Sequence, residues 1–229
     1  MSLNWFPDIS AALAAEEALF ESMPPKAGMR QWLMWQGQKS LVVPRSFARR
    51  PGLSEAMARS REAGWPVFMR QTGGDVVPQG PGTLNVSLAW VEEGGQGSSI
   101  IQGYAAICDP IRAVLGGTYG SVDSAFCDGA FNIVINGRKL AGTAQRRRRK
   151  GVHTLVLAHA LILVDEDIEV GVAATNDFLS SLGQTTGLRA DAHVNAAEAL
   201  CDYALTPARL ANRLLVHLAG NNLASEMAA

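Results

Sequence analysis

Residues 131–141 read Phe131-Asn132-Ile133-Val134-Ile135-Asn136-Gly137-Arg138-Lys139-Leu140-Ala141. This pattern predicts a β-hairpin, because two short strand-like segments flank the dipeptide Asn136-Gly137. A two-residue type I′ turn requires positive φ at both of its central positions, and Asn and Gly tolerate that conformation. We therefore expect two antiparallel strands that meet at Asn136 and Gly137.

Outward from this hairpin, further elements are predicted from apolar runs and from helix start and stop signals. Strands are expected at residues 30–35, 40–43, 66–70, 84–91 and 152–164. Residues 92–99 are expected to form a flexible loop. Helices are expected at residues 9–20, 54–63 (Ser54 as N-cap, Gly64 at the end), 103–114, 192–203 (after Asp191) and 207–219 (Thr206 as N-cap, Pro207 first, Gly220 past the end). Because strands and helices mix without regular alternation, the pattern favours an α+β fold with a mixed or antiparallel sheet flanked by helices.

Composition places the chain among globular proteins. It has 229 residues, of which 48% are hydrophobic and 18% charged, and its net charge is -1. A nucleic-acid binder would carry a basic excess, so that class is not expected. The longest strongly apolar run, 155–164, is about half of a ~20-residue membrane span. Three cysteines without a CxxC pair, and a start without signal-peptide features, indicate a cytoplasmic protein.

Two segments are candidates for chemistry. The first is Arg70-Gln71-Thr72-Gly73-Gly74-Asp75, which follows a predicted strand and continues to Asn85. Adjacent glycines allow backbone N–H groups to approach a ligand, although an ordinary turn has the same composition. The second is Lys139, which precedes the small residues Gly142, Thr143 and Ala144. Its ammonium can enter a pocket and neutralise an anion, or it can be a solvated hairpin lysine.

Other reactive or charged side chains allow two interpretations each. The run Arg146-Arg147-Arg148-Arg149-Lys150 is either a solvated loop or a docking patch for an acidic partner. His153 and His159 share a strand face, but no third ligand has zinc-like spacing, so wall or core histidines are expected rather than a metal pair. Cys127 is either a packed thiol or a nucleophile.

Together these segments resemble the lipoate–protein ligase A family, within the biotin/lipoate ligase and octanoyltransferase superfamily. The resemblance covers the chain from the helix at 11–20 to about residue 183. It is most specific in two blocks. Arg70 to Asn85 is similar to Arg-x-x-Gly-Gly followed by Gly-x-Leu-Asn, and within Asn132 to Gln145 the segment from Gly137 is similar to Gly-Arg-Lys-x-x-Gly-Ser/Thr-Ala-Gln. His159 falls where the family has a His on the next strand.

The resemblance implies an enzyme that activates lipoate or octanoate with ATP and Mg²⁺, forms an acyl-adenylate, and acylates a lysine of a lipoyl domain. Such acceptors are of the 2-oxoacid dehydrogenase E2 or glycine cleavage H protein type. It also implies that Lys139 is the catalytic lysine and that substrate or adenylate contacts come from Arg70, Gly73, Gly74, Asn85, Asn132, Gly142, Thr143, Ala144 and His159. No metal ligand is expected from the motifs, and no nucleic acid or membrane is an expected partner.

Departures from the family pattern leave alternatives open. Asp75, Gln79 and Pro44 stand where many family ligases have Gly, His and Gly. Residues 1–185 are expected to form the catalytic domain, and residues 186–229 a short helical extension packed on it. That tail is shorter than a ligase accessory domain, so a partner chain is one expectation. The alternatives are an ATP-independent transferase that uses acyl carrier protein or a lipoyl protein as donor, and a non-catalytic acyl binder. For a transferase Cys127 is the candidate nucleophile, although Ser124 lies at the spacing expected from the family.

Overall fold

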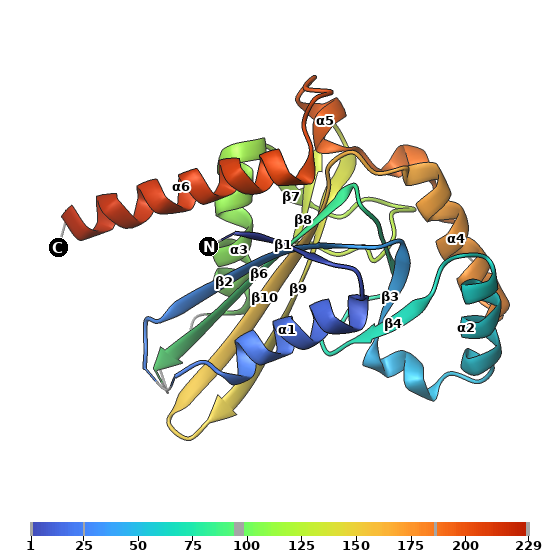
Figure 1. Cartoon of the computed structure of the whole chain (residues 1–229), viewed down its shortest axis with the longest axis horizontal. Helices are drawn as coiled ribbons and strands as arrows, with labels where there is room; N and C mark the ends of the chain where they lie inside the picture. The colour runs from blue at the N-terminus through green and yellow to red at the C-terminus, as the bar shows by residue number, and fades with distance from the viewer. Residues whose placement is uncertain (1, 25, 94–98, 186, 228–229) are drawn as a thin grey trace.

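The chain folds around a seven-stranded sheet with the order β1-β2-β6-β10-β9-β8-β7 (Figure 1). The computed structural model describes residues 2–24, 26–93, 99–185 and 187–227. All neighbours in this sheet are antiparallel except β1, which runs parallel to β2. The mixed sheet with flanking helices confirms the predicted α+β class. Its strands are β1 (Leu3–Phe6), β2 (Arg30–Gly37), β6 (Thr83–Glu93), β7 (Thr118–Gly120), β8 (Asn132–Ile135), β9 (Arg138–Lys150) and β10 (His153–Leu163).

The hairpin predicted from Asn136-Gly137 joins β8 to β9. Asn136 has a φ of 50° and Gly137 a φ of 74°, the positive values that the tight turn requires. β9 then extends far beyond the predicted end of the hairpin and pairs along its length with β10. The turn therefore places Lys139 near the start of a long strand in the interior of the sheet.

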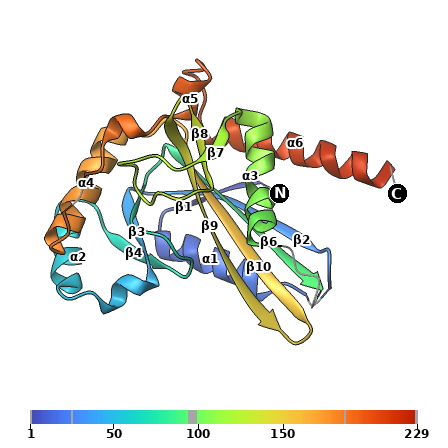
Figure 2. The same cartoon turned by 180° about the vertical axis from the view of Figure 1, so that it is seen from behind.

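Helices cover both faces of the main sheet, because alternate residues of its central strands are apolar on both sides. On one face α1 (Ile9–Glu21) contributes Phe20, which packs with Ala89 and Leu157. On the other face lie α3 (Ile100–Leu115) and α6 (Pro207–Met227), which pack on the alternate residues Leu88, Trp90 and Val156 (Figure 2). The α1 face holds the candidate site described below.

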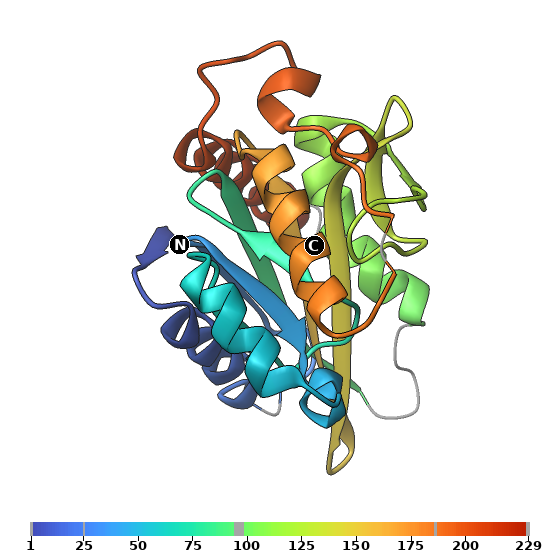
Figure 3. The ribbon, with the colours of Figure 1, turned by 90° about the vertical axis from the view of Figure 1, so that its right-hand side faces the viewer.

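A smaller three-stranded sheet, ordered β4-β3-β5, stands beside the α1 face. It consists of β3 (Ser40–Pro44), β4 (Val67–Arg70) and β5 (Val77–Gln79). The helices α2 (Leu53–Glu62) and α4 (Ile168–Ser181) lie next to each other against it (Figure 3). This arrangement directs the end of β4, and with it Arg70 and the glycine loop, toward the main sheet.

Several sequence predictions of elements were wrong. α2 begins after Gly52, in the left-handed conformation with a φ of 73°, so Ser54 lies inside the helix and is not its cap. The predicted helix at 192–203 is reduced to α5 (Ala196–Ala199), preceded by a 3-10 turn at Ala190–Ala192. α6 continues through Gly220, where we expected it to end. Five of the described elements were not predicted: β1, β5, β7, α4 and a 3-10 helix at Arg45–Arg49.

The predicted loop at 92–99 is only partly described. Glu92 and Glu93 belong to β6, and Ser99 caps α3 through a bond from the Gln102 N–H, while residues 94–98 lie outside the described residues. The division into a catalytic domain and an extension at residue 185 stays a prediction, although Leu210 and Leu214 of α6 pack into the core of the main sheet. Among the described helices, none has the length and apolarity of a membrane span.

Candidate active site

A narrow inner pocket lies between the α1 face of the main sheet and the small sheet. Strand register explains its floor, because four consecutive strands place partners side by side: Trp35 on β2, Asn85 on β6, Leu161 on β10 and Gly142 on β9. His159 lies two residues from Leu161 and so shares its face. The remaining walls come from α1, from the small sheet and from the loop before β8, through Leu13, Glu16, Val42, Arg70, Val77, Gln79, Phe126 and Cys127.

A second, more polar outer pocket adjoins the first. It is lined by Gly73, Gly74, Tyr104, Asp128, Gly129, Ala130, Phe131, Asn132 and Gln145, and it shares Cys127, Thr143 and Ala144 with the inner pocket. The two pockets therefore meet at Cys127. The outer pocket has a volume of about 190 Å³ and the inner pocket one of about 30 Å³. A bound molecule can therefore place its reactive carbon beside this thiol from the outer pocket, whereas an apolar tail requires the lining of the inner pocket to move apart.

Hydrogen-bond donors surround the sulfur of Cys127. The backbone N–H of Asp75 lies 3.0 Å from Sγ, and Nη2 of Arg70 lies 3.8 Å from it. Both donors are within hydrogen-bond distance of this sulfur. Gly74 provides the space for this contact, because a Cβ at its position would lie 2.6 Å from Sγ. With a φ of 104° Gly74 also adopts a conformation that side-chain-bearing residues avoid.

The guanidinium of Arg70 organises the glycine loop. It donates to the carbonyl of Val42 at 2.9 Å, and its Nη2 donates to the carbonyls of Gly73 at 2.9 Å and Asp75 at 2.8 Å. Arg70 is buried, so these carbonyls fix both its position and the shape of the loop. The predicted loop is thus a preformed structure wrapped around one arginine, and it brings the Asp75 N–H to Cys127.

Lys139 is fully buried, with 1% of its surface exposed, so it is not a solvated hairpin residue. Its Nζ donates to the carbonyl of Phe126 at 2.6 Å and to the carbonyl of Cys127 at 2.8 Å. Burial lowers the pKa of Lys139 from 10.5 to about 8. Gly142 makes room for this side chain, since a Cβ there would lie 3.1 Å from Nζ. Lys139 and the candidate nucleophile Cys127 are therefore held next to each other by a hydrogen bond.

A buried ionic network closes another side of the inner pocket. Glu16 accepts a bond from Ser87 Oγ at 2.5 Å and contacts Nδ1 of His159 at 3.3 Å, while Nε2 of His159 lies 3.4 Å from Thr72 Oγ1. Burial raises the pKa of Glu16, but the charge and hydrogen bonds of His159, the Ser87 bond and Arg70 outweigh it and hold this pKa below its usual value. Glu16 is a site residue that the sequence analysis missed.

Amide groups form the end of the inner pocket over β2 and β6. Gln79 and Asn85 exchange two hydrogen bonds, of 3.1 and 2.8 Å, and Thr83 Oγ1 also donates to Gln79 Oε1 at 3.2 Å. Gln79, which departs from the family pattern, is thus used in a buried side-chain network. Two buried donors on lining residues, Trp35 Nε1 and Arg70 Nε, have no hydrogen-bond partner within the part of the chain that the structure describes.

Some predicted candidates lie away from the site or play other roles. Ser124, favoured by spacing, lines neither pocket, whereas Cys127 lines both. His153 lies six residues along β10 from His159, roughly 20 Å away, so the two cannot share a metal ion. Pro44 ends β3, where it pairs with Arg70. Asp75 accepts a bond from the Val76 N–H through Oδ1.

The basic run at 146–150 is part of β9, so the loop interpretation was wrong. Its first three arginines pair with carboxylates of the same chain: Arg146 with Glu17, Arg147 with Glu92 and Arg148 with Glu21. Arg146 and Arg148 also lie over the ring of Phe20. The run therefore fastens β9 to α1 and β6, and only its exposed end, Arg149 and Lys150, is left for the predicted docking role.

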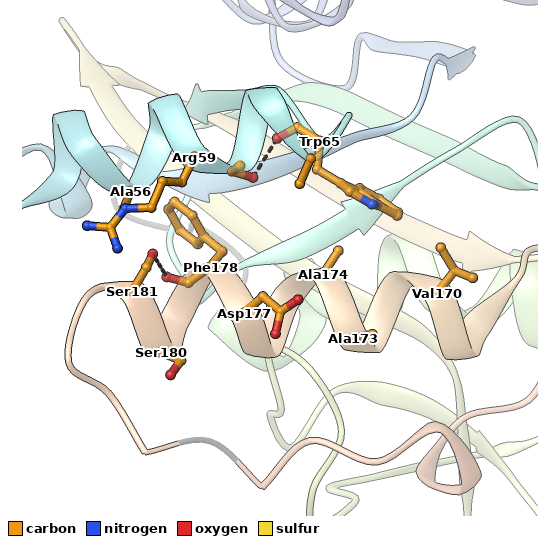
Figure 4. Close-up of a pocket in the computed structure, with 12 residues that line it drawn as sticks. Ala56, Arg59, Trp65, Val170, Ala173, Ala174, Asp177, Phe178, Ser180 and Ser181 are labelled. Carbon is orange, nitrogen blue, oxygen red and sulfur yellow. Dashed lines mark hydrogen bonds between the residues drawn. The ribbon is translucent and has the colours of Figure 1, made fainter.

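A wider groove between α2 and α4 has no catalytic features (Figure 4). Trp65 and Phe178 contribute aromatic surface to it, and small residues such as Ala173 and Ala174 form much of the rest. Two of its three serines are engaged locally, with Ser60 donating to the Trp65 carbonyl and Ser181 to the Phe178 carbonyl. None of the predicted site residues lines this groove.

A buried amine and a thiol at the junction of two pockets are features of a catalytic domain. The chain belongs to the Lipoyl protein ligase A/B catalytic domain family, which it matches over residues 8–219. This confirms the resemblance inferred from the sequence and extends it through most of α6.

Among its relatives, an uncharacterized protein of Cupriavidus necator is 36% identical over 184 residues, or 73% of each chain. The octanoyl-[GcvH]:protein N-octanoyltransferase of Kyrpidia tusciae is 36% identical over 171 residues, which are 68% of this chain and 56% of that protein. The chain thus spans little more than half the length of that transferase. The crystal structure of lipoate-protein ligase A bound with ATP superposes with a TM-score of 0.71 at 17% identity, covering 96% of this chain and 83% of the other, which shows a shared fold.

Proposed function

We propose that this protein is an acyltransferase that carries an octanoyl or lipoyl group as a thioester on Cys127 and passes it to a lysine of a lipoyl domain. The observation that carries this proposal is the place of the Cys127 sulfur, at the junction of the inner and outer pockets and within reach of two donors. The name of the Kyrpidia tusciae relative supports transfer from an octanoylated GcvH-type protein.

The reaction has two displacements. In the first, the Cys127 thiolate attacks the acyl carbonyl of the donor, a C–S bond forms, and the donor's C–N or C–S bond breaks as its amine or thiol leaves with a proton. In the second, the amine of the acceptor lysine attacks the thioester, loses a proton, and releases Cys127. Lys139, whose Nζ donates to the carbonyls of Phe126 and Cys127, holds the nucleophile's backbone in place during both displacements, and the protons are exchanged with water.

The residues around the pockets fit ATP less well than they fit an acyl group. Activation of a carboxylate by ATP requires free cationic groups that offset the charge of the phosphates. Here the guanidinium of Arg70 is committed to three carbonyls and to Cys127, and Lys139 is committed to two carbonyls. Asp128 adds a carboxylate to the wall of the outer pocket. We therefore derive no step through ATP or Mg²⁺.

The direct test is to trap the acyl-enzyme. The chain is incubated with an octanoylated GcvH-type lipoyl protein, without acceptor, and intact mass is recorded before and after treatment with neutral hydroxylamine, which cleaves thioesters. We expect one hydroxylamine-labile octanoyl group, absent in Cys127→Ser and retained in the matched variant Cys201→Ser, whose thiol is exposed and lines neither pocket.

An ATP-dependent ligase mechanism predicts the opposite outcome for Cys127→Ser. Lipoate-dependent exchange of pyrophosphate into ATP by the purified chain, together with normal acyl transfer by Cys127→Ser, would replace the thioester mechanism by adenylate chemistry. Binding of lipoate or octanoate with neither transfer nor exchange would identify a non-catalytic member of the family.

A further inference from the structure

The peptide that carries Cys127 is held by a residue far along the chain, His193. This residue follows the short turn Ala190–Ala192, and only 1% of its surface is exposed. The segment pairs with β9, since the Val194 N–H donates to the carbonyl of Lys139 at 3.0 Å. His193 is thus placed beside Lys139 by backbone pairing, although no sequence motif connects the two.

The hydrogen bonds of His193 define its tautomer. Nδ1 lies 2.9 Å from the carbonyl of Arg189, which can only accept, so Nδ1 carries the proton. Nε2 is then the acceptor for the N–H of Phe126, at 3.1 Å. The imidazole also stacks on the Phe126 ring, with centroids 4.1 Å apart. Burial lowers the pKa of His193 to about 4, so the ring stays neutral and keeps this acceptor at neutral pH.

Phe126 is therefore fixed from both sides of its backbone. His193 accepts its N–H, and Lys139 donates to its carbonyl as well as to that of Cys127. The next residue, Cys127, has a φ of 47°, a conformation that non-glycine residues rarely adopt. Such a conformation persists only where surrounding contacts determine it. Here these three bonds hold the backbone of Phe126 and Cys127, while Arg70 and the Asp75 N–H contact the sulfur.

We propose that His193 is a positioning residue for the nucleophile: by accepting the Phe126 N–H, it holds Cys127 in the conformation that directs its sulfur to Arg70 and to the Asp75 N–H. This inference rests on the proposed function for its catalytic meaning, but the conformation of the thiol can be tested without any substrate. His193 itself lines neither pocket, so it acts only through Phe126 and Cys127.

A matched pair of variants separates the two bonds of the imidazole. In His193→Gln, the side-chain oxygen can take the place of Nε2 and accept the Phe126 N–H. In His193→Asn, the side-chain nitrogen can take the place of Nδ1 and donate to Arg189, but nothing reaches Phe126. Both are made in a Cys201→Ser background. Cys108 is buried and burial raises its pKa to about 12, so iodoacetamide then reports on Cys127.

We expect His193→Asn to slow alkylation of Cys127 about tenfold, the effect of one hydrogen bond, while His193→Gln stays within about twofold of the parent. In acyl transfer, the Asn variant should lose kcat with KM unchanged, and the Gln variant should restore kcat. Equal effects of the two variants, or a fully reactive thiol in the Asn variant, would overturn the proposal.

Two further readouts keep the test decisive. If the variants unfold, hydrogen exchange of the Phe126 amide in the wild-type protein decides: strong protection is expected, and rapid exchange in the folded state refutes the bond. If the wild-type protein transfers no acyl group but alkylation still distinguishes Asn from Gln, the proposed function fails and the positioning role of His193 stands.

Discussion

Replacing Lys139 by methionine tests whether a buried cation is present beside Cys127. In the wild-type protein the pKa of Lys139 falls from 10.5 in the unfolded chain to about 8 in the folded state. Below pH 8 both states are protonated, and the folded protein bears the cost of a buried charge. At about 1.4 kcal/mol per pKa unit, that cost is about 3 kcal/mol. It disappears as the pH rises from 8 to 10.5, because the folded state releases its proton first.

The wild-type free energy of unfolding should therefore rise, relative to Lys139→Met, by about 3 kcal/mol across this range. Urea unfolding of both proteins at several pH values between 8 and 10.5 measures the difference. Groups that titrate equally in the two proteins cancel, and the two lost hydrogen bonds to carbonyls shift the difference without giving it a slope. A difference that stays constant across the range would refute a buried amine with a lowered pKa. Acyl transfer by Lys139→Met should be absent at every pH.

Three shorter predictions follow from other contacts. Gly74→Ala should lower kcat by about 100-fold by displacing the Cys127 sulfur, whereas Gly73→Ala, where a Cβ meets nothing within 4 Å, should remain active; equal rates would contradict this. Glu16→Leu should lower the free energy of unfolding, measured in urea, by about 3 kcal/mol, because His159 and Ser87 lose their partner. The wild-type protein should lose this difference as the pH falls below 4.5, because the Glu16 pKa is held below that value and protonation removes the charge. Because His193 has its pKa lowered from 6.5 to about 4, stability should fall across that window on acidification, and less steeply in His193→Gln.

Sequence patterns predicted those elements whose conformation depends on neighbouring residues, and failed for elements that depend on contacts with distant parts of the chain. The Asn136-Gly137 turn follows from backbone conformation alone, and it placed Lys139 on a strand. The basic run at 146–150 was misjudged because its carboxylate partners come from α1 and β6, distant in sequence. α4 was missed because the apolar residues that pack it, such as Phe178, face the small sheet, whose three strands are themselves assembled from separate parts of the chain.

The candidate site combines residues that belong to sequence motifs with residues that only packing brings there. Arg70, Gly74 and Lys139 belong to recognisable segments, and the structure places all three next to Cys127, Arg70 and Gly74 at its sulfur and Lys139 at its carbonyl. The choice between Ser124 and Cys127 could not follow from spacing, because both lie in an irregular segment with positive φ, at 65° and 47°. Glu16 and His193 reach the site from elements that pack on it and carry no local signal. A buried polar residue inside a predicted apolar helix face, such as Glu16, is the one feature that could have drawn attention.

The inner and outer pockets share the lining residues Cys127, Thr143 and Ala144, and this arrangement has a consequence for the kinetics of transfer. If the acyl tail occupies the inner pocket while its carbonyl is bound to Cys127, the acyl group does not move when the protein partners change. Donor and acceptor then use the same outer pocket in turn, and no complex containing both can form. Steady-state rates should give parallel double-reciprocal lines, and an excess of either protein should inhibit the other. A donor protein that has just lost its acyl group can then still bind the outer pocket, where it competes with the next acceptor protein.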